Sequence, residues 1–153
     1  MTPNYNFRQD LPVAQKTEYE VARLLCDVYK ADARTIEMCH DNRYDIKAFI
    51  NNGWFTFEVK EDFTCERTGN VGVEYSCRGK PSGIAVSQAD FYIYKIHSQE
   101  QGIVFLIFST KHLKALVDEK LYFRTVNGGD AGSDSLNYLF KYNTFVANGK
   151  VLK

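Results

Sequence analysis

Three residues near the middle of the chain have the types and spacing needed for metal-dependent phosphate chemistry. Twelve residues separate Asp45 from Glu58, and Lys60 follows two positions later. Two carboxylates and a backbone carbonyl, here that of Val59, supply the oxygen ligands that Mg²⁺ or Mn²⁺ prefers. Such an ion activates water and stabilises charge on a transferring phosphate. The lysine can orient the attacking water, act on its proton or neutralise the transition state, and the sequence leaves these three roles open.

The segments around these residues predict a β-hairpin. Residues 43–50 and 54–60 alternate apolar and polar side chains, and the intervening Asn-Asn-Gly at 51–53 is a typical tight-turn sequence. One face should cover the core with Ile46, Ala48, Ile50, Phe55, Phe57 and Val59. The opposite face then carries Asp45, Glu58 and Lys60.

The register of this hairpin depends on which two residues form its turn. If Asn51 and Asn52 do so, Asp45 lies directly opposite Glu58; if the turn is at 52–53, Asp45 lies opposite Lys60 and diagonal to Glu58. Directly opposed residues are roughly 5 Å apart and diagonal ones roughly 7–8 Å. Both registers place the three side chains on one face.

A helix over residues 15–30 should precede the hairpin, because apolar residues at 21, 24, 25 and 28 recur at helical spacing. Glu18 lies on the same stripe as Val21 and Leu25, so we expect it to point toward the sheet. Glu20 is the competing choice and faces further round the helix.

The order of these elements resembles the PD-(D/E)xK nuclease superfamily. There, a glutamate-bearing helix precedes an aspartate at the start of a strand, and (D/E)xK follows on the hairpin partner. Here TEYEVARLL, YDI and FEVK occupy those places, with Tyr44 replacing a proline that is not a ligand. The segment GKPSGIAVSQADFYIY is also similar to one in small phage and Holliday-junction-resolvase-like members. The resemblance covers residues 15–110.

The resemblance implies an α/β fold with a restriction-endonuclease-like core. In this fold a central mixed β-sheet carries the catalytic hairpin, and we expect helices over 15–30 and 110–120 to flank it. We treat residues 1–153 as a single nuclease domain, with an irregular lead-in over 1–14.

The implied function is that of a divalent-metal-dependent endonuclease that hydrolyses DNA phosphodiester bonds. It would be structure-selective, like a Holliday-junction resolvase, or would nick DNA, with Asp45, Glu58, Lys60 and Glu18 as catalytic residues. Mg²⁺ or Mn²⁺ would be bound by Asp45, Glu58 and the carbonyl of Val59, with no nucleotide cofactor. DNA is the expected partner, a homodimer the expected assembly, and the cytoplasm (the host's, for a phage protein) the expected compartment.

Two other function classes stay open. One is a catalytically inactive superfamily member that binds nucleic acid or protein. The other is a structural or interaction domain in which Asp45, Glu58 and Lys60 form only a solvated strand face. A histidine-metal nuclease site at His40 and Asp41 is disfavoured, because the other two histidines lie far along the chain.

Five further residues could support the site or contact DNA. Glu74 alternates with apolar neighbours on a predicted strand over 71–77, and Gln88 and Asp90 flank a helix-to-strand junction. Arg78 and Lys80 lie in a loop from which they could reach phosphate. Each has an alternative as an exposed strand residue, a turn cap or a solvent-facing charge.

The remaining elements are assigned from local pattern. We expect a strand over 34–39, a short helix over 83–88, strands over 89–97 and 102–109, and a helix over 110–120 with Thr110 as N-cap. Residues 127–135 should form a flexible loop, and residues 137–146 a last packing element.

Composition narrows the function classes. With 44% hydrophobic and 14% aromatic residues the chain should be folded. It has neither an apolar run long enough for a membrane span nor a recognisable signal peptide. Nineteen basic and nineteen acidic residues give zero net charge, which argues against a general DNA-coating protein. Four cysteines without a CxxC pair argue against a zinc site.

Overall fold

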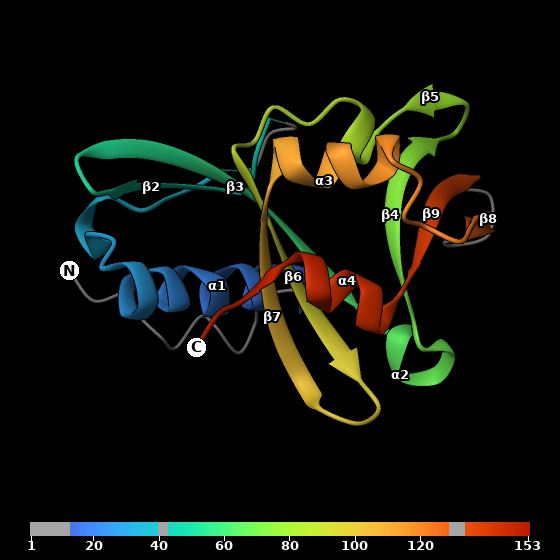
Figure 1. Cartoon of the computed structure of the whole chain (residues 1–153). Helices are drawn as coiled ribbons and strands as arrows, with labels where there is room; N and C mark the ends of the chain where they lie inside the picture. Colours follow the sequence, from blue (N-terminus) through green and yellow to red (C-terminus); the bar gives the residue numbers. More distant parts are fainter. Residues whose placement is uncertain (1–12, 40–42, 129–133) are drawn as a thin grey trace.

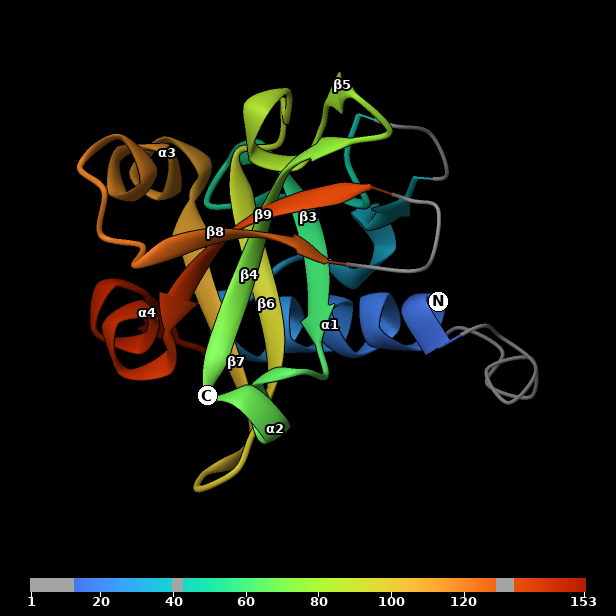
Figure 2. The ribbon, with the colours of Figure 1, turned by 90° about the vertical axis from the view of Figure 1, so that its right-hand side faces the viewer.

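The computed structural model describes residues 13–39, 43–128 and 134–153. Within them, the strands form a six-stranded mixed sheet and a four-stranded antiparallel sheet (Figures 1 and 2). The larger sheet has, in spatial order, β1 (Glu37–Met38), β2 (Ile46–Ile50), β3 (Gly53–Asp62), β6 (Phe91–Ser98), β7 (Gly102–Ser109) and β10 (Lys150–Val151). The smaller sheet has β5 (Lys80–Pro81), β4 (Asn70–Cys77), β9 (Ser135–Lys141) and β8 (Arg124–Gly128). The helical segments are α1 (Val13–Tyr29), η2 (Ala33–Thr35), α2 (Cys65–Thr68), η3 (Gly83–Ala85), α3 (Thr110–Asp118) and α4 (Tyr142–Asn148).

Strands β2 and β3 form the predicted hairpin, with Asn51 and Asn52 as its two-residue turn. Both asparagines have positive φ, 50° and 64°, which this residue tolerates better than most. Ile50 pairs with Gly53 and Ile46 with Phe57, so the first of the two predicted registers is confirmed. Asp45 comes just before β2, where its backbone N–H donates to the Phe57 carbonyl at 2.9 Å, next to Glu58 on β3.

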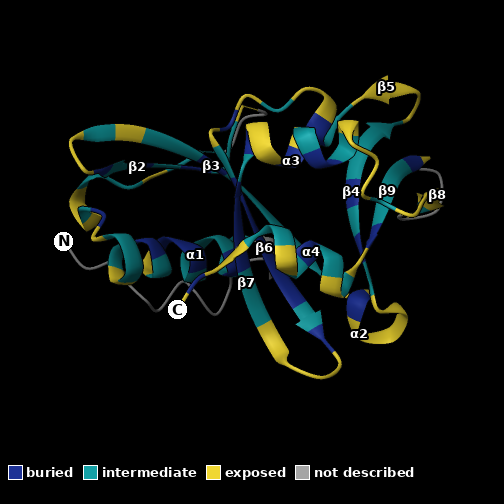
Figure 3. Ribbon diagram, viewed as in Figure 1, coloured by how far each residue is buried: buried dark blue, intermediate teal, exposed yellow. Residues whose placement is uncertain are grey.

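The larger sheet is covered by helices on both faces, as expected for a mixed α/β sheet. Helix α1 packs Val21 and Leu25 on one face, together with the buried side of the hairpin. Helices α3 and α4 cover the other face, where Leu113 and Phe145 join the core around β6 and β7. Only β3 and β6 pair in parallel; the other described pairs of this sheet are antiparallel. Strand β6 is buried along most of its length, and Figure 3 shows it at the centre of the molecule.

The smaller sheet is the part of the fold that the sequence did not indicate. Residues 137–146, expected as one element, divide between β9 and α4, and the predicted loop over 127–135 begins inside β8 and ends inside β9. Within that loop, residues 129–133 lie outside the described residues. Alternation places Val71, Val73 and Phe140 in the core, while Gly72, Glu74 and Asn137 share the other face.

Several predicted boundaries are corrected. The segment 34–39 forms the 3₁₀ turn η2 and then the short β1, and the helix predicted over 83–88 is reduced to η3. Ser109, not Thr110, caps α3, because its hydroxyl accepts the backbone N–H of His112 at 3.0 Å. The last two residues of the predicted 1–14 lead-in belong to α1, and residues 1–12 lie outside the description. In the described part of the chain, no helix is long and apolar enough to cross a membrane.

Candidate functional site

Asp45, Glu58 and Lys60 line one cavity of about 360 Å³. The carboxyls of Asp45 and Glu58 are hydrogen-bonding neighbours, and Lys60 follows on the same face of β3 with its ammonium 3.6 Å from a Glu58 oxygen. The other wall is the segment from Pro81 to Ser87, which includes η3. Tyr92, the register partner of Glu58 on β6, completes the lining. The structure therefore brings the predicted triad together beside open space.

A hydrogen bond fixes the Asp45 carboxyl. Its Oδ2 accepts the backbone N–H of Val59 at 2.8 Å, at the point where β3 continues and β2 has not yet begun. In a strand, the N–H and C=O of one residue point to the same side. The Val59 carbonyl therefore also points toward the Asp45 side of β3, which is the orientation that the predicted ligand set requires.

Burial, together with repulsion from Asp45, raises the pKa of two carboxyls near the site, those of Glu18 and Glu58. Burial, reinforced by the charge of Asp45, raises the pKa of Glu18 to about 7. Burial also raises the pKa of Glu58 to about 7; Asp45 adds to this rise and Lys60 opposes it. A site that carries carboxyls with raised pKa values is one that a bound cation would stabilise.

The two glutamates of α1, Glu18 and Glu20, have different neighbours. Glu18 lies within electrostatic reach of Asp45. Glu20 instead faces Lys95, whose ammonium donates to it at 2.6 Å.

The hydroxyl of Tyr92 is a buried polar group at this cavity. Tyr92 is only 1% exposed. Burial raises its pKa to about 12, and a hydrogen bond with the Ser87 side chain offsets this only in part. In the sequence, Tyr92 is one of several polar positions of β6, together with Tyr94, Lys95 and His97.

The cavity wall formed by η3 depends on close contact with β4. Gly83 has φ +51°, and a Cβ on it would lie 2.2 Å from the carbonyl oxygen of Glu74. The Glu74 carboxylate accepts hydrogen bonds from Ser82 at 2.9 Å and from Ser135 at 2.7 Å. Glu74 therefore ties the wall to β9, and it lines a second, neighbouring hollow rather than the cavity that Asp45 and Glu58 line.

The other predicted supporting residues lie around the site, outside the cavity lining. Asp90 fastens the start of β6 to β3, since its carboxylate accepts the backbone N–H of Thr56 at 2.8 Å. Gln88 is exposed. Arg78 and Lys80 are exposed on the β4–β5 hairpin, next to Pro81 of the cavity wall. His40 and Asp41 lie outside the described residues.

A second polar cluster, which the sequence reasoning missed, lies on the α1 face of the sheet. Glu61 accepts hydrogen bonds from Thr17 at 2.5 Å and contacts His97 at 2.6 Å, and its oxygen lies 3.6 Å from the ammonium of Lys95. Burial alone would raise the pKa of Glu61, but the contacts with Thr17, His97 and Lys95 lower it overall. Lys95 and His97 were detectable as polar positions in the apolar strand β6. Because they bind partners on α1 and β3, we assign this cluster to helix attachment.

Comparisons with models of protein families, with curated proteins and with solved structures find no match. In addition, no three His, Cys, Asp or Glu side chains within the described ranges lie close enough together to form a ready metal site. The grounds for a functional assignment are therefore the two neighbouring carboxyls of Asp45 and Glu58, the lysine beside them and the cavity that they share.

Proposed function

We propose that the protein is a divalent-metal-dependent nuclease of the PD-(D/E)xK type, with a restriction-endonuclease-like core, that hydrolyses DNA phosphodiester bonds. The observation that carries this proposal is that three side chains meet at one open cavity. The Asp45 and Glu58 carboxyls interact directly, and the Lys60 ammonium lies 3.6 Å from Glu58.

The donor set fits Mg²⁺ or Mn²⁺. Asp45, Glu58 and the Val59 carbonyl would hold the ion, and Mg²⁺ in proteins usually keeps several waters and needs only one or two carboxylates. The lack of a three-side-chain cluster among the described residues is compatible with this mode of binding. When bound, the ion would supply an activated water and neutralise charge on the phosphate.

The chain's own residues have distinct roles in this proposal. Lys60, whose side chain is 38% exposed, reaches the cavity as a cation and stabilises charge that develops on the phosphate. The Tyr92 hydroxyl keeps its proton at neutral pH and donates to a water or a phosphate oxygen. Glu18 adds negative charge beside Asp45 and so favours the cation.

Cleavage assays with Mn²⁺ on branched, nicked, single-stranded and duplex DNA test the proposal. We expect the wild type to cut, and Asp45→Asn and Lys60→Ala to lower the rate on the order of 10²–10³-fold. Lys47→Ala is the matched control, because Lys47 lies on the same hairpin but over Trp54, at 5.1 Å from its ring. Equal cutting by all four proteins would contradict the proposal. The mass of the complex that the protein forms with a branched DNA junction also tests whether the protein acts as the expected homodimer.

One observation favours the alternative of an inactive binding module, namely the lack of a ready three-ligand site among the described residues. In that case the wild type would bind DNA without cutting it in Mn²⁺ or Mg²⁺. Asp45→Asn would then leave DNA affinity unchanged or would increase it, since a negative charge is removed.

A further inference from the structure

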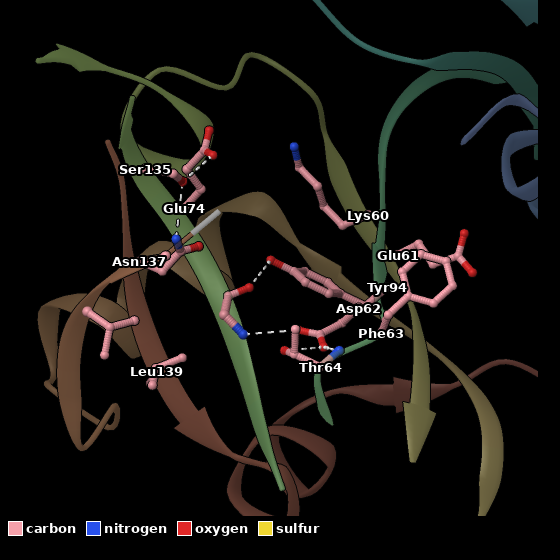
Figure 4. A pocket seen from close by; sticks show the side chains of 13 residues that line it. Lys60, Glu61, Asp62, Phe63, Thr64, Glu74, Tyr94, Ser135, Asn137 and Leu139 are labelled. Carbon is pink, nitrogen blue, oxygen red and sulfur yellow. Dashed lines mark hydrogen bonds between the residues drawn. The ribbon is translucent and has the colours of Figure 1, made fainter. Parts of the chain in front are cut away.

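A second hollow, a groove of about 520 Å³, lies beside the cavity of the proposed site, and Lys60 lines both. One side of the groove is the end of β3 and the turn that follows it, residues 60–64. The other side is the face of the smaller sheet that carries Glu74, Asn137 and Leu139. Figure 4 shows Lys60 extending from β3 into the space between these two sides. Lys60 therefore borders both hollows.

The interior of the groove is unsuited to a phosphate. Three carboxylates line it, and each is already engaged within the protein. Asp62 accepts backbone N–H groups of Thr64 and Cys65 at 2.9 Å each, Glu61 binds the α1-face cluster, and Glu74 binds two serines. Lys60, at the junction with the cavity, is the one cation among the described lining residues. An anion placed deeper would meet negative charge without a counterion.

The same interior suits a flat, uncharged group with polar edges. The Tyr94 ring, Val126 and Leu139 supply apolar surface, while Thr64 and Asn137 supply neutral hydrogen-bonding groups. Phe63 is 56% exposed, but it stacks on His97 with ring centroids 4.6 Å apart, on the side of β3 away from the smaller sheet (Figure 4). Inside the groove, the surface against which an uncharged ring could pack is therefore mainly that of Val126 and Leu139.

Two cations, Arg124 and Lys141, lie on the same face of the smaller sheet as Leu139. Arg124 is the register partner of Leu139, so the two side chains share a face, and Lys141 follows on that face two residues later. Both cations are exposed and lie over the Phe123 ring, at 5.6 and 5.5 Å. Positive charge therefore lies at Lys60 and again beyond Leu139, outside the lining, while the carboxylates between them are engaged within the protein.

We propose that this groove binds the base of an unpaired nucleotide next to the phosphate that is cut, so that the substrate is single-stranded or splayed DNA. The inference rests on the proposed nuclease function. A hollow of about 520 Å³ is in the size range of sites for small ligands. A base inside a duplex is stacked and paired, and it would have to leave the helix to enter such a site.

Single-stranded oligonucleotides with one abasic residue at each position around the cut provide the test. We expect wild type with Mn²⁺ to cut the intact strand about tenfold faster than the strand whose abasic residue occupies the groove. Leu139→Phe should slow cutting of the intact strand by a similar factor, and should leave the rate on that abasic strand unchanged. Leu121→Phe is the matched control on an exposed surface and should change neither rate.

Two outcomes would overturn the groove proposal while the nuclease assignment stands. They are duplex DNA cut faster than single-stranded DNA, and abasic strands cut as fast as intact ones at every position.

A binding assay keeps the proposal testable if the wild type cuts nothing. The anisotropy of a labelled oligothymidylate is measured with Asp45→Asn protein, alone and combined with Leu139→Phe or Leu121→Phe. A loss of affinity only with Leu139→Phe supports the groove. Equal affinities, or no binding, reject it.

Discussion

At the residue scale, Asp45 adds to the effect of burial on the charge state of two neighbouring glutamates. Its carboxylate is held against β3 by the Val59 N–H, and its charge contributes to the raised pKa of both Glu18 and Glu58. Burial is the larger cause of the raised pKa of each glutamate. A substitution that removes only the charge of Asp45 separates the two causes. The same arrangement explains why a cation would be favoured here.

Asp45→Asn is that substitution, because asparagine keeps the volume and can still accept the Val59 N–H. We expect the pKa of Glu18 and of Glu58 to fall from about 7 toward 4.5, without reaching it while burial persists. Carboxyl ¹³C chemical shifts followed through a pH titration measure both values. Asp118→Asn, an exposed position at the end of α3, is the control and should move neither. Unchanged values in Asp45→Asn would show that the three carboxyls do not interact.

At the element scale, the cavity depends on how closely η3 approaches β4. Gly83→Ala places a methyl group 2.2 Å from a backbone oxygen and also introduces a side chain at positive φ. We expect a loss of about 2–3 kcal/mol in the free energy of unfolding and a lower DNA-cutting rate, because the wall from Ser82 to Ser87 must move. Urea denaturation and the cleavage assay measure the two effects.

Gly79→Ala is the matched comparison for this prediction. Gly79 also has positive φ, +75°, but a Cβ there meets nothing within 4 Å. It should therefore lose only the conformational part, about 1 kcal/mol, and keep its cleavage rate. If the two variants behave alike, the close contact of η3 with β4 is not what shapes the cavity.

The attachment of α1 to the sheet is a second feature that depends on contacts between elements. Lys95 is 8% exposed and lies between Glu20 of α1 and Glu61 of β3. Lys95→Met leaves two carboxylates without their cation, so we expect a loss of about 2–4 kcal/mol in thermal or urea denaturation. Lys111→Met, exposed on α3, should change stability by less than about 0.5 kcal/mol. If Lys95→Met leaves the free energy of unfolding unchanged, apolar packing alone holds α1 on the sheet.

The sequence predicted those elements whose pattern is local. The β2–β3 hairpin followed from strict alternation around Asn-Asn-Gly, and the stripe through Val21 and Leu25 predicted α1 to within two residues at each end. The register itself required the backbone, because either pair, 51–52 or 52–53, can form a tight turn. The left-handed conformation of both asparagines decided it.

The features that the sequence did not predict depend on contacts between distant segments. Strand β9 pairs with β4 some sixty residues earlier, and nothing in the run from 137 to 146 indicates where its strand ends and its helix begins. The bond that joins Glu74 to Ser135 spans the same separation, so its role as a tie between walls was not visible. The surroundings of the Tyr92 hydroxyl, which include Ser87 and the charge of Glu58, likewise depend on how separate segments pack together.

At the scale of the whole molecule, β3 joins all the parts that the proposed function needs. Its buried side belongs to the core under α1, its polar side carries Glu58 and Lys60, and its last residues border the groove beneath the smaller sheet. Because the net charge is zero, the protein lacks a general attraction for phosphate. Affinity for DNA would then have to come from local contacts in the cavity and groove, which is where metal and unpaired bases would act.

The raised carboxyl pKa values also predict how the stability of the whole molecule depends on pH. In the folded state Glu18 and Glu58 hold protons up to about pH 7, whereas in the unfolded chain they lose them near 4.5. Between these values the folded state binds more protons, so without metal the free energy of unfolding should fall as pH rises from about 5 to 7. Glu61, with its lowered pKa, acts in the opposite direction but only below this window.

Urea denaturation of the wild type in EDTA, from pH 4.5 to 8, measures this slope, and the double variant Glu18→Gln with Glu58→Gln should flatten it. Mn²⁺ should restore stability in the wild type chiefly above pH 7, because its ligands must be deprotonated to bind it. A wild type whose stability does not fall over this window, or a double variant that keeps the fall, would show that these carboxyls are not held neutral. If Mn²⁺ restores stability at high pH in the wild type but not in the double variant, then the loss of stability comes from the same carboxylates that are proposed to bind the cation.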